Sequence, residues 1–212
     1  MGSLDTGYEE FEFERKFLVR QLPSYLQEEK PALIVQNYFL AQDGYALRVR
    51  VQCNALKADF KAFGGIAELL EEHRNAFEFS SLTAKGPMVG GTRYESEKEL
   101  DVKIGLEMVL RGKNRVAKNR YGVWVAQDGW VIDVFGGENS SLIIAECERQ
   151  GPVIDLQIPQ FAHTEVTEDA RFSNEYLAVN PYQNWRHDYE TELRHSGVKF
   201  SQDFGQNSWE NN

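Results

Sequence analysis

Hydrophobic and polar residues alternate along much of this chain, and a period of two is typical of strands with one buried face. The clearest example is residues 10–19, where phenylalanines fill one face and charged residues the other. The same alternation predicts further strands at residues 45–51, 81–85, 93–100, 116–125, 130–135 and 142–148. Between two of these, Asp128-Gly129 is a typical hairpin turn. The pattern therefore indicates a mainly antiparallel β structure.

Helical stretches are fewer and are predicted at residues 23–30, 66–77, 101–112 and 174–178. Together with the strands they place the chain in the α+β class. We expect a main domain at residues 10–180, with a tail at residues 1–9, a helical insert at residues 52–80 and a polar C-terminal appendage at residues 181–212.

The polar faces of the predicted strands carry charged residues two positions apart, so the members of each set point the same way. The sets are Glu12, Glu14 and Lys16; Arg48 and Arg50; Glu95, Glu97 and Glu99; Lys118 and Arg120; and Glu146 and Glu148. On any single strand, the simplest interpretation is the solvent face of an ordinary sheet. Taken together, however, the opposite faces are rich in large apolar residues, as if helices and loops cover them. A barrel with a charged interior explains both faces.

Such an interior suits a chain of phosphates. Arginine and lysine bind phosphate oxygens, whereas clustered carboxylates repel each other unless divalent cations lie among them. Mg²⁺ or Mn²⁺ between carboxylate and phosphate oxygens would balance both excesses of charge. Asp133 lies within an apolar strand and needs a cation or metal partner, because burial of an unpaired carboxylate is costly.

The composition excludes several classes of partner. The 212 residues carry a formal net charge of −10, which argues against a general nucleic-acid binder. No run approaches the roughly 20 apolar residues of a membrane span, and the N-terminus lacks a signal-peptide pattern. We expect a cytoplasmic protein with a small-molecule partner and no membrane, and a homodimer is left open. Cys53 and Cys147 are too few for a disulfide scaffold, so reduced structural thiols are expected.

The motif Glu12-x-Glu14-x-Lys16 opens an ordered series of motifs. It is followed by Gln36-Asn37-Tyr38, Arg48-Val49-Arg50, Leu82-Thr83-Ala84-Lys85-Gly86, residues 93–100, Lys118-Asn119-Arg120-Tyr121, Ile132-Asp133-Val134-Phe135, Ala145-Glu146-Cys147-Glu148 and Glu165-Val166-Thr167-Glu168-Asp169. In this order they resemble the CYTH superfamily, the triphosphate tunnel metalloenzymes, over residues 11–178. The resemblance implies an eight-stranded closed antiparallel barrel with helices outside, a triphosphate substrate inside it, and phosphoanhydride chemistry that depends on Mg²⁺ or Mn²⁺.

The resemblance also implies roles for individual residues. The phosphate-binding cations would be Arg48, Arg50, Lys85, Lys118 and Arg120. The metal ligands would be Glu12, Glu14, Glu97, Glu99, Glu146 and Glu148, with Asp133 assisting. Lys16, beside Tyr38, corresponds to a position at the reacting end of the substrate, where water is oriented or activated. Three alternating acids at 95, 97 and 99 leave open which two match the family's pair.

The function that follows is metal-dependent hydrolysis of a triphosphate by water, with inorganic tripolyphosphate as the first choice because no base-recognition pocket is needed. A nucleoside or thiamine triphosphatase is the nearest alternative. An adenylyl cyclase of the same superfamily would require adenine contacts that the sequence does not identify. From a different class, a polyphosphate or nucleotide sensor would bind without catalysis, and Lys16 with the complete set of carboxylates favours the enzyme over it.

Overall fold

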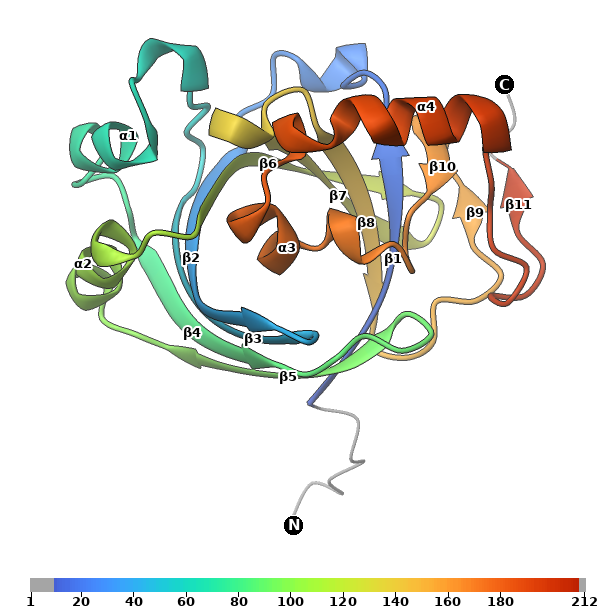
Figure 1. The fold of residues 1–212 in the computed structure, drawn as a ribbon, viewed down its shortest axis with the longest axis horizontal. Coiled ribbons are helices and arrows are strands. Elements are labelled where there is room, and N and C mark those ends of the chain that lie inside the picture. Colours follow the sequence, from blue (N-terminus) through green and yellow to red (C-terminus); the bar gives the residue numbers. More distant parts are fainter. Residues whose placement is uncertain (1–9, 210–212) are drawn as a thin grey trace.

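The structure is a computed structural model that describes residues 10–209, so the expected tail at residues 1–9 lies outside the described residues. Eight antiparallel strands close into a barrel, as the sequence and the resemblance predict (Figure 1). They are β1 (Phe11–Val19), β2 (Ala32–Gln42), β3 (Tyr45–Cys53), β4 (Phe79–Lys85), β5 (Thr92–Glu99), β6 (Arg115–Val125), β7 (Asp128–Phe135) and β8 (Ile143–Arg149). Their order around the barrel is β1-β5-β4-β3-β2-β6-β7-β8, and β8 pairs back onto β1.

Strand β1 closes the barrel and pairs with three other strands. One edge runs along β8, while the other edge is shared by the start of β5 and by β10 (Ala162–Glu165). A separate parallel pair joins β9 (Gln157–Ile158) to β11 (Ser208–Trp209), which brings the C-terminal segment alongside the barrel.

Of the eight barrel strands, β2 is the one that the alternation pattern missed, and the short strands β9, β10 and β11 were not predicted either. Leu33, Ile34 and Val35 are all buried, so this part of the strand is apolar on both faces and has no period of two. Leu33 and Val35 pack into the cluster beneath the helices α1 (Ile66–Glu72) and α2 (Val102–Arg111), on the outside of the barrel. Figure 1 shows both helices outside the ring of strands.

Two local predictions were wrong. Residues 23–30 form no α-helix and contain only the 3₁₀ turn η1 (Ser24–Leu26), since the segment is short, buries Leu26 alone and ends before Pro31. The hairpin between β6 and β7 exists, but its turn is Ala126-Gln127, with a positive φ of 52° at Ala126. Asp128 and Gly129 instead pair with Val125 and Trp124 at the start of β7.

The other predicted helices are present with shorter or shifted ends. Helix α1 stops at Glu72, whereas α2 is bounded as predicted by Asp101, whose side chain caps it, and by Gly112. Helix α3 (Asn174–Val179) is capped by Ser173, and α4 (Arg186–Ser196) follows it. The remaining short turns are η2 (Phe60–Ala62), η3 (Gly137–Asn139), η4 (Ala170–Phe172) and η5 (Tyr182–Asn184).

One end of the barrel is filled by apolar residues around α3. Leu18, Phe135 and Ile144 from the strands form one cluster with Leu177 of α3 and Trp185 at the start of α4. Trp185 lies edge-on to the rings of Phe172, Tyr182 and Tyr189. Residues 181–209 therefore pack on the barrel with aromatic side chains, and Figure 1 shows α3 within the outline of the ring and α4 across it.

The outer face of β1 carries a buried ion pair that holds the C-terminal segment against the barrel. The Arg15 guanidinium is fully buried and donates twice to the Glu165 carboxylate, at 2.8 Å each. Ser201 donates its backbone N–H to the same carboxylate, while Arg15 also lies over the ring of Phe204.

We expect Glu165→Gln to lower the free energy of unfolding by about 3 kcal/mol, because it leaves a buried guanidinium without a counter-charge. Urea denaturation monitored by tryptophan fluorescence measures this loss. Glu190→Gln is the matched control, since Glu190 pairs with Arg20 near the surface and should cost less than about 1 kcal/mol. Equal losses in the two variants would contradict the importance of the buried pair.

Candidate active site

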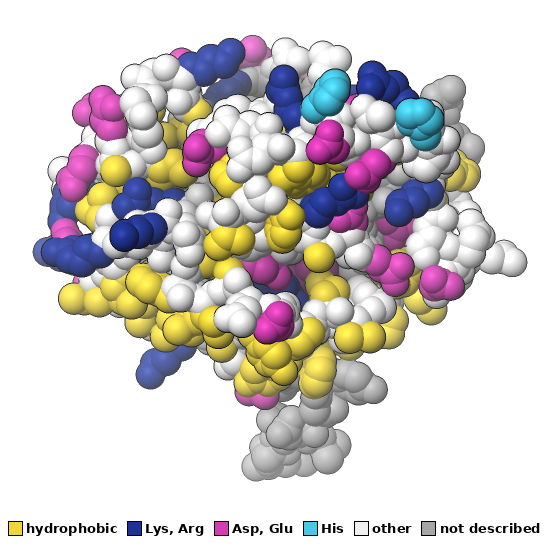
Figure 2. Space-filling model, viewed as in Figure 1, with side chains coloured by type: hydrophobic (Ala, Val, Ile, Leu, Met, Phe, Trp, Pro, Cys, Tyr) yellow, Lys and Arg dark blue, Asp and Glu magenta, His cyan; other side chains and the backbone are white. Residues whose placement is uncertain are grey.

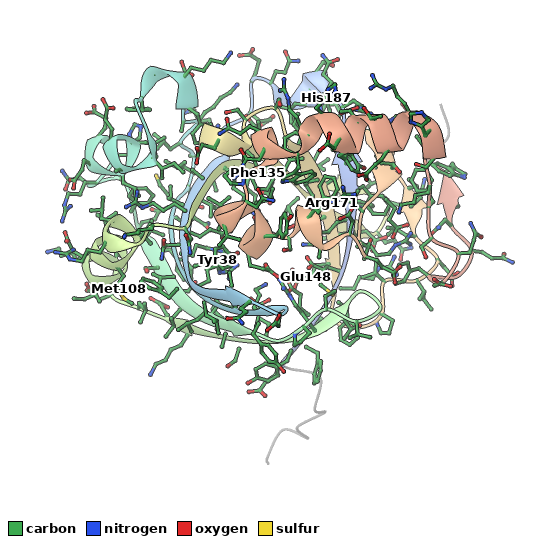
Figure 3. All side chains as sticks on the ribbon, in the orientation of Figure 1. Tyr38, Met108, Phe135, Glu148, Arg171 and His187 are labelled. Carbon is green, nitrogen blue, oxygen red and sulfur yellow. The ribbon has the colours of Figure 1, made fainter. Side chains whose placement is uncertain are left out.

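The charged faces of the strands point into the barrel. Figure 3 shows Tyr38 of β2 and Glu148 of β8 inside the ring of strands, on opposite sides of it. The inward residues also include Lys16 of β1, Arg48 of β3 and Asp133 of β7, each of which is almost wholly buried. The interior is therefore lined by ionisable side chains, which need partners because burial penalises isolated charges.

Lys16 lies between two carboxylates. Its Nζ donates to Glu14 at 2.7 Å and to Glu146, directly opposite it on β8, at 2.9 Å. Burial alone would lower the pKa of Lys16, but the negative charges of Glu14 and Glu146 outweigh it and raise the pKa above its ordinary value. Lys16 is thus an ammonium at neutral pH, able to orient a group but not to accept its proton.

A second chain of ion pairs runs across β1, β4 and β5. Lys85 bridges Glu12 at 2.9 Å and Glu95 at 2.6 Å. Arg93 donates to Glu12 at 3.0 Å and, from its other side, to Glu175 of α3 at 2.7 Å. The predicted metal ligand Glu12 is therefore held by two cations.

The arginines of β3 form an electropositive region. Arg48 donates to Thr83 at 2.7 Å and to Glu97 at 3.1 Å, but its Nε is buried without a hydrogen-bond partner among the described residues. The Nε of Arg50 is buried and unpaired in the same way. Burial, then the neighbouring Arg48 and Arg120, lowers the pKa of Arg50 to about 10. Unpaired donors in a region of excess positive charge suit an anion.

Asp133 holds two of the predicted phosphate-binding cations. Its fully buried carboxylate accepts from Lys118 at 2.5 Å and, in a bidentate arrangement, from Arg120 at 2.7 Å twice. Arg120 also reaches Glu146 at 3.0 Å, and Lys118 reaches Asn174 of α3 at 3.2 Å. Asp133 thus has the cation partner that its apolar surroundings require.

The carboxylates near the start of β1 form an electronegative region. Glu148 is exposed near the end of β8 and lies directly opposite Glu14, and partial burial together with the charges of Glu12, Glu14 and Glu95 raises its pKa to about 7. The pKa of Glu14 is also raised, first by burial, and its Oε1 is buried without a hydrogen-bond partner among the described residues. This excess of negative charge would be relieved by a cation.

The residues in this region fit a divalent metal ion by their chemistry. Carboxylate oxygens are the ligands that Mg²⁺ and Mn²⁺ prefer, and Glu12 and Glu14 of β1 and Glu148 of the neighbouring β8 supply them. Within residues 10–209, no three acidic, histidine or cysteine side chains already converge in a metal-binding arrangement. The lysines and arginines that hold these carboxylates would have to share them with a metal.

Of the predicted site residues, Glu99 lies away from the interior, whereas Tyr38 lies inside with its hydroxyl near tunnel cations. Glu99 is exposed at the end of β5, whereas Glu95 and Glu97 contact the tunnel cations Lys85 and Arg48. Tyr38 is 2% exposed, its hydroxyl accepts from Gln36 at 3.1 Å, and it belongs to the apolar cluster around α3. Burial raises the pKa of Tyr38, so its hydroxyl stays protonated.

Sequence reasoning missed Arg93 and Glu175. Arg93 lies two residues before Glu95 on the inward face of β5, so the alternation used for Glu95 also places Arg93 inside. Glu175 comes from α3, and no strand pattern indicates that this helix enters the barrel. A pocket of about 490 Å³ beside α3 reaches Lys16, Arg93 and Glu175, and Figure 2 shows acidic and basic side chains in the hollow near the centre of this face.

No family model matches the chain. An inorganic triphosphatase from Acetivibrio thermocellus is 36% identical over 107 residues, which span 50% of this chain and 69% of that protein. The chain belongs to the CYTH superfamily of triphosphate tunnel metalloenzymes. The resemblance that begins at Glu12-x-Glu14-x-Lys16 is therefore confirmed.

Two solved structures also resemble this CYTH protein. The crystal structure of the inorganic triphosphatase NE1496 is 26% identical, covers 80% of this chain and 95% of its own, and has a TM-score of 0.49. An adenylyl cyclase-like protein from Hippeastrum, HpAC1, is described as having a dominant triphosphatase activity. It is 16% identical, covers 88% of both chains and has a TM-score of 0.39. Within the described part of this CYTH protein, no helix is long and apolar enough to cross a membrane.

Anion binding in this CYTH barrel should weaken as pH rises through about 8. Burial, then Arg120, lowers the pKa of Lys118 to about 8, despite the opposing effect of Asp133. Because the ammonium attracts an anion and the neutral amine does not, loss of this proton reduces affinity. We expect Kd for tripolyphosphate, used as a probe, to increase up to tenfold per pH unit above this value.

The matched variant is Lys118→Arg, whose guanidinium keeps its proton over the same range. Calorimetric titrations between about pH 7 and 10 should give a smaller increase of Kd with pH for the variant. Protonation of tripolyphosphate itself affects both proteins equally, so it cancels in the ratio of their Kd values. Parallel profiles in the two proteins would show that Lys118 does not cause the pH dependence.

Proposed function

We propose that this protein hydrolyses triphosphates inside its barrel, with inorganic tripolyphosphate as the preferred substrate and a divalent metal ion, Mg²⁺ or Mn²⁺, as cofactor. The observation that carries the proposal is the arrangement of interior charge. Arg48, Arg50 and Arg120 form a region with unpaired buried donors, and the carboxylates around Glu148 form a region with excess negative charge. The Acetivibrio relative, itself an inorganic triphosphatase, supports the same reaction.

In the proposed complex, the phosphate chain lies along the cations. Arg48 and Arg50 would donate the N–H groups that lack partners, and Lys85, Lys118 and Arg120 would exchange part of their carboxylate contacts for phosphate oxygens. Arginine suits this role because its fork of donors matches the oxygens of a phosphate group.

The metal would be held by Glu12, Glu14 and Glu148, with Glu97 and Glu146 as further carboxylates within the barrel. When bound, a divalent ion would neutralise charge on the phosphates and on these carboxylates. The metal would thus add positive charge beside the carboxylates, while the cations of β3 and β6 would bind phosphate oxygens.

The reaction transfers a phosphoryl group to water. The water oxygen bonds to a phosphorus atom, the bridging P–O bond breaks, and the bridging oxygen leaves with the shorter phosphate chain. The proton that the water loses is taken up by this leaving oxygen. Lys16, an ammonium held by Glu14 and Glu146, would hold the attacking water or a phosphate oxygen in position. Its proton makes it a positioning group rather than a base.

Inorganic tripolyphosphate is favoured over a nucleotide because the described interior offers mainly charged groups, and the aromatic residues beside them, Tyr38 and Phe135, pack into the apolar cluster around α3. Tyr38, the aromatic residue of the predicted set, is packed into the apolar cluster around α3. A cytoplasmic location and a homodimer stay predictions from the sequence.

The direct test is phosphate release from tripolyphosphate, ATP and thiamine triphosphate, with Mg²⁺, Mn²⁺ or EDTA. We expect release from tripolyphosphate with a metal and none with EDTA. Glu14→Gln should lower kcat/KM about 100-fold, equivalent to ~2.7 kcal/mol of transition-state stabilisation. Glu99→Gln, a matched control at an exposed position on β5, should change it less than about threefold.

Other outcomes of this test point elsewhere. Tight calorimetric binding of tripolyphosphate without phosphate release would favour the sensor. Faster release from ATP or thiamine triphosphate would favour an organic triphosphate, and equal losses in Glu14→Gln and Glu99→Gln would contradict the assignment of metal ligands within the barrel.

Lys16→Arg tests the role of Lys16 separately. Arginine preserves the positive charge of Lys16, which is an ammonium in the native protein. We expect Lys16→Arg to keep at least a tenth of the wild-type kcat with an unshifted pH profile, whereas Lys16→Met should lower kcat about 100-fold. Steady-state kinetics across about pH 6 to 9 measure both variants. Equal inactivation by arginine and methionine would mean that Lys16 acts through more than its charge.

A further inference from the structure

Helix α3 reaches the tunnel through its first two residues. Asn174 accepts from Lys118 of β6 at 3.2 Å, and Glu175 accepts from Arg93 of β5 at 2.7 Å. These two cations come from different sides of the barrel, so the start of α3 spans its interior at one end. The remainder of α3 is fixed by Leu177, which is fully buried in the apolar cluster.

Glu175 brings a negative charge to this end of the tunnel. It is 9% exposed, and its Oε2 is buried without a hydrogen-bond partner among the described residues. Burial raises the pKa of Glu175, but the charge of Arg93 and the hydrogen bonds to the carboxylate together lower it below its ordinary value. The carboxylate is therefore ionised at neutral pH, and one of its two oxygens has no hydrogen-bond partner among the described residues.

Beyond Glu175 lies the pocket of about 490 Å³ described above. Besides Lys16 and Arg93, the residues that line it include Asp43, Glu168 and Asp169. Asp169 is paired with Arg171, while Asp43 and Glu168 are exposed. A phosphate chain that extended past Arg93 would leave the tunnel cations and enter a space that carries several carboxylates.

We propose that Glu175, placed by α3, is the residue that limits the length of the phosphate chain to three units. This inference rests on the proposed function. The cations Arg48, Arg50, Lys118 and Arg120 hold the chain, and a fourth phosphate would meet the Glu175 carboxylate at the end of the tunnel. Repulsion between the two anions in a site with little water disfavours the longer chain. Glu175 is a specificity-determining residue that takes no part in the transfer of the phosphoryl group.

The test compares tripolyphosphate with tetraphosphate. Kd for each is measured by calorimetry with EDTA and with Mg²⁺, and phosphate release from each is measured beside it. Wild-type protein is expected to favour tripolyphosphate at least tenfold. Glu175→Gln keeps the shape and the hydrogen bond to Arg93 but removes the charge, and it should reduce this preference about tenfold, equivalent to ~1.4 kcal/mol, mainly through tighter binding of tetraphosphate.

Two further variants support the comparison. Glu175→Ala removes both the charge and the bulk, so it should bind tetraphosphate at least as well as Glu175→Gln. It keeps the test decisive if the glutamine side chain itself blocks this end of the tunnel. Glu190→Gln is the matched control, because it removes the same charge from the C-terminal region at a site that pairs with Arg20. Its preference should equal that of the wild type.

The outcomes separate the inference from the proposed function. The inference is overturned, while hydrolysis stands, if both Glu175 variants keep the wild-type preference for tripolyphosphate. It is overturned likewise if the wild type binds tripolyphosphate and tetraphosphate equally. Binding without phosphate release overturns hydrolysis, and the ratio of the two Kd values then still decides the role of Glu175. No binding of either chain in either condition overturns both.

Discussion

Closure of the barrel is the constraint on which the rest of the structure depends. Once β8 pairs with β1, every second residue of eight strands must point into one enclosed space. In this chain those residues are largely charged, and burial of unpaired charges is costly. The sequence therefore needs cations and carboxylates on strands that become neighbours or face each other. The pairs Lys16 with Glu146 and Arg120 with Asp133 are cross-strand pairs of this kind.

Closure also explains why the hydrophobic core lies mostly outside the barrel. The outward residues of β2 and β3 pack under α1 and α2, and those of β1, β7 and β8 pack under residues 153–162. Cys147 belongs to this outer layer, and both Cys53 and Cys147 are buried free thiols, as expected from the sequence. Inside, the apolar cluster of the described residues lies around α3, so the same helix completes a core and limits the charged space.

Alternation alone was sufficient to predict the charged interior, because a period of two assigns each residue of a strand to one face. It identified Lys16, Arg48, Lys118 and Glu148 without any knowledge of which strands pair. It could not identify β2, whose Leu33, Ile34 and Val35 are buried on both faces. Nor could it identify Glu175, because a helix that enters a barrel leaves no periodic signal in the strands that receive it.

The distribution of charge within the barrel carries the functional argument further than the number of charges does. If each carboxylate were paired with one cation, the interior would be neutral everywhere, and binding of a charged ligand would stabilise it little. Instead, the pKa of Arg50 is lowered to about 10 by burial and neighbouring cations, while that of Glu148 is raised to about 7 by burial and neighbouring carboxylates. An anion placed at the first region and a cation placed at the second each relieve a repulsion that the fold itself maintains. A triphosphate with a divalent metal ion supplies both charges in one complex, so the barrel is complementary to the pair rather than to either alone.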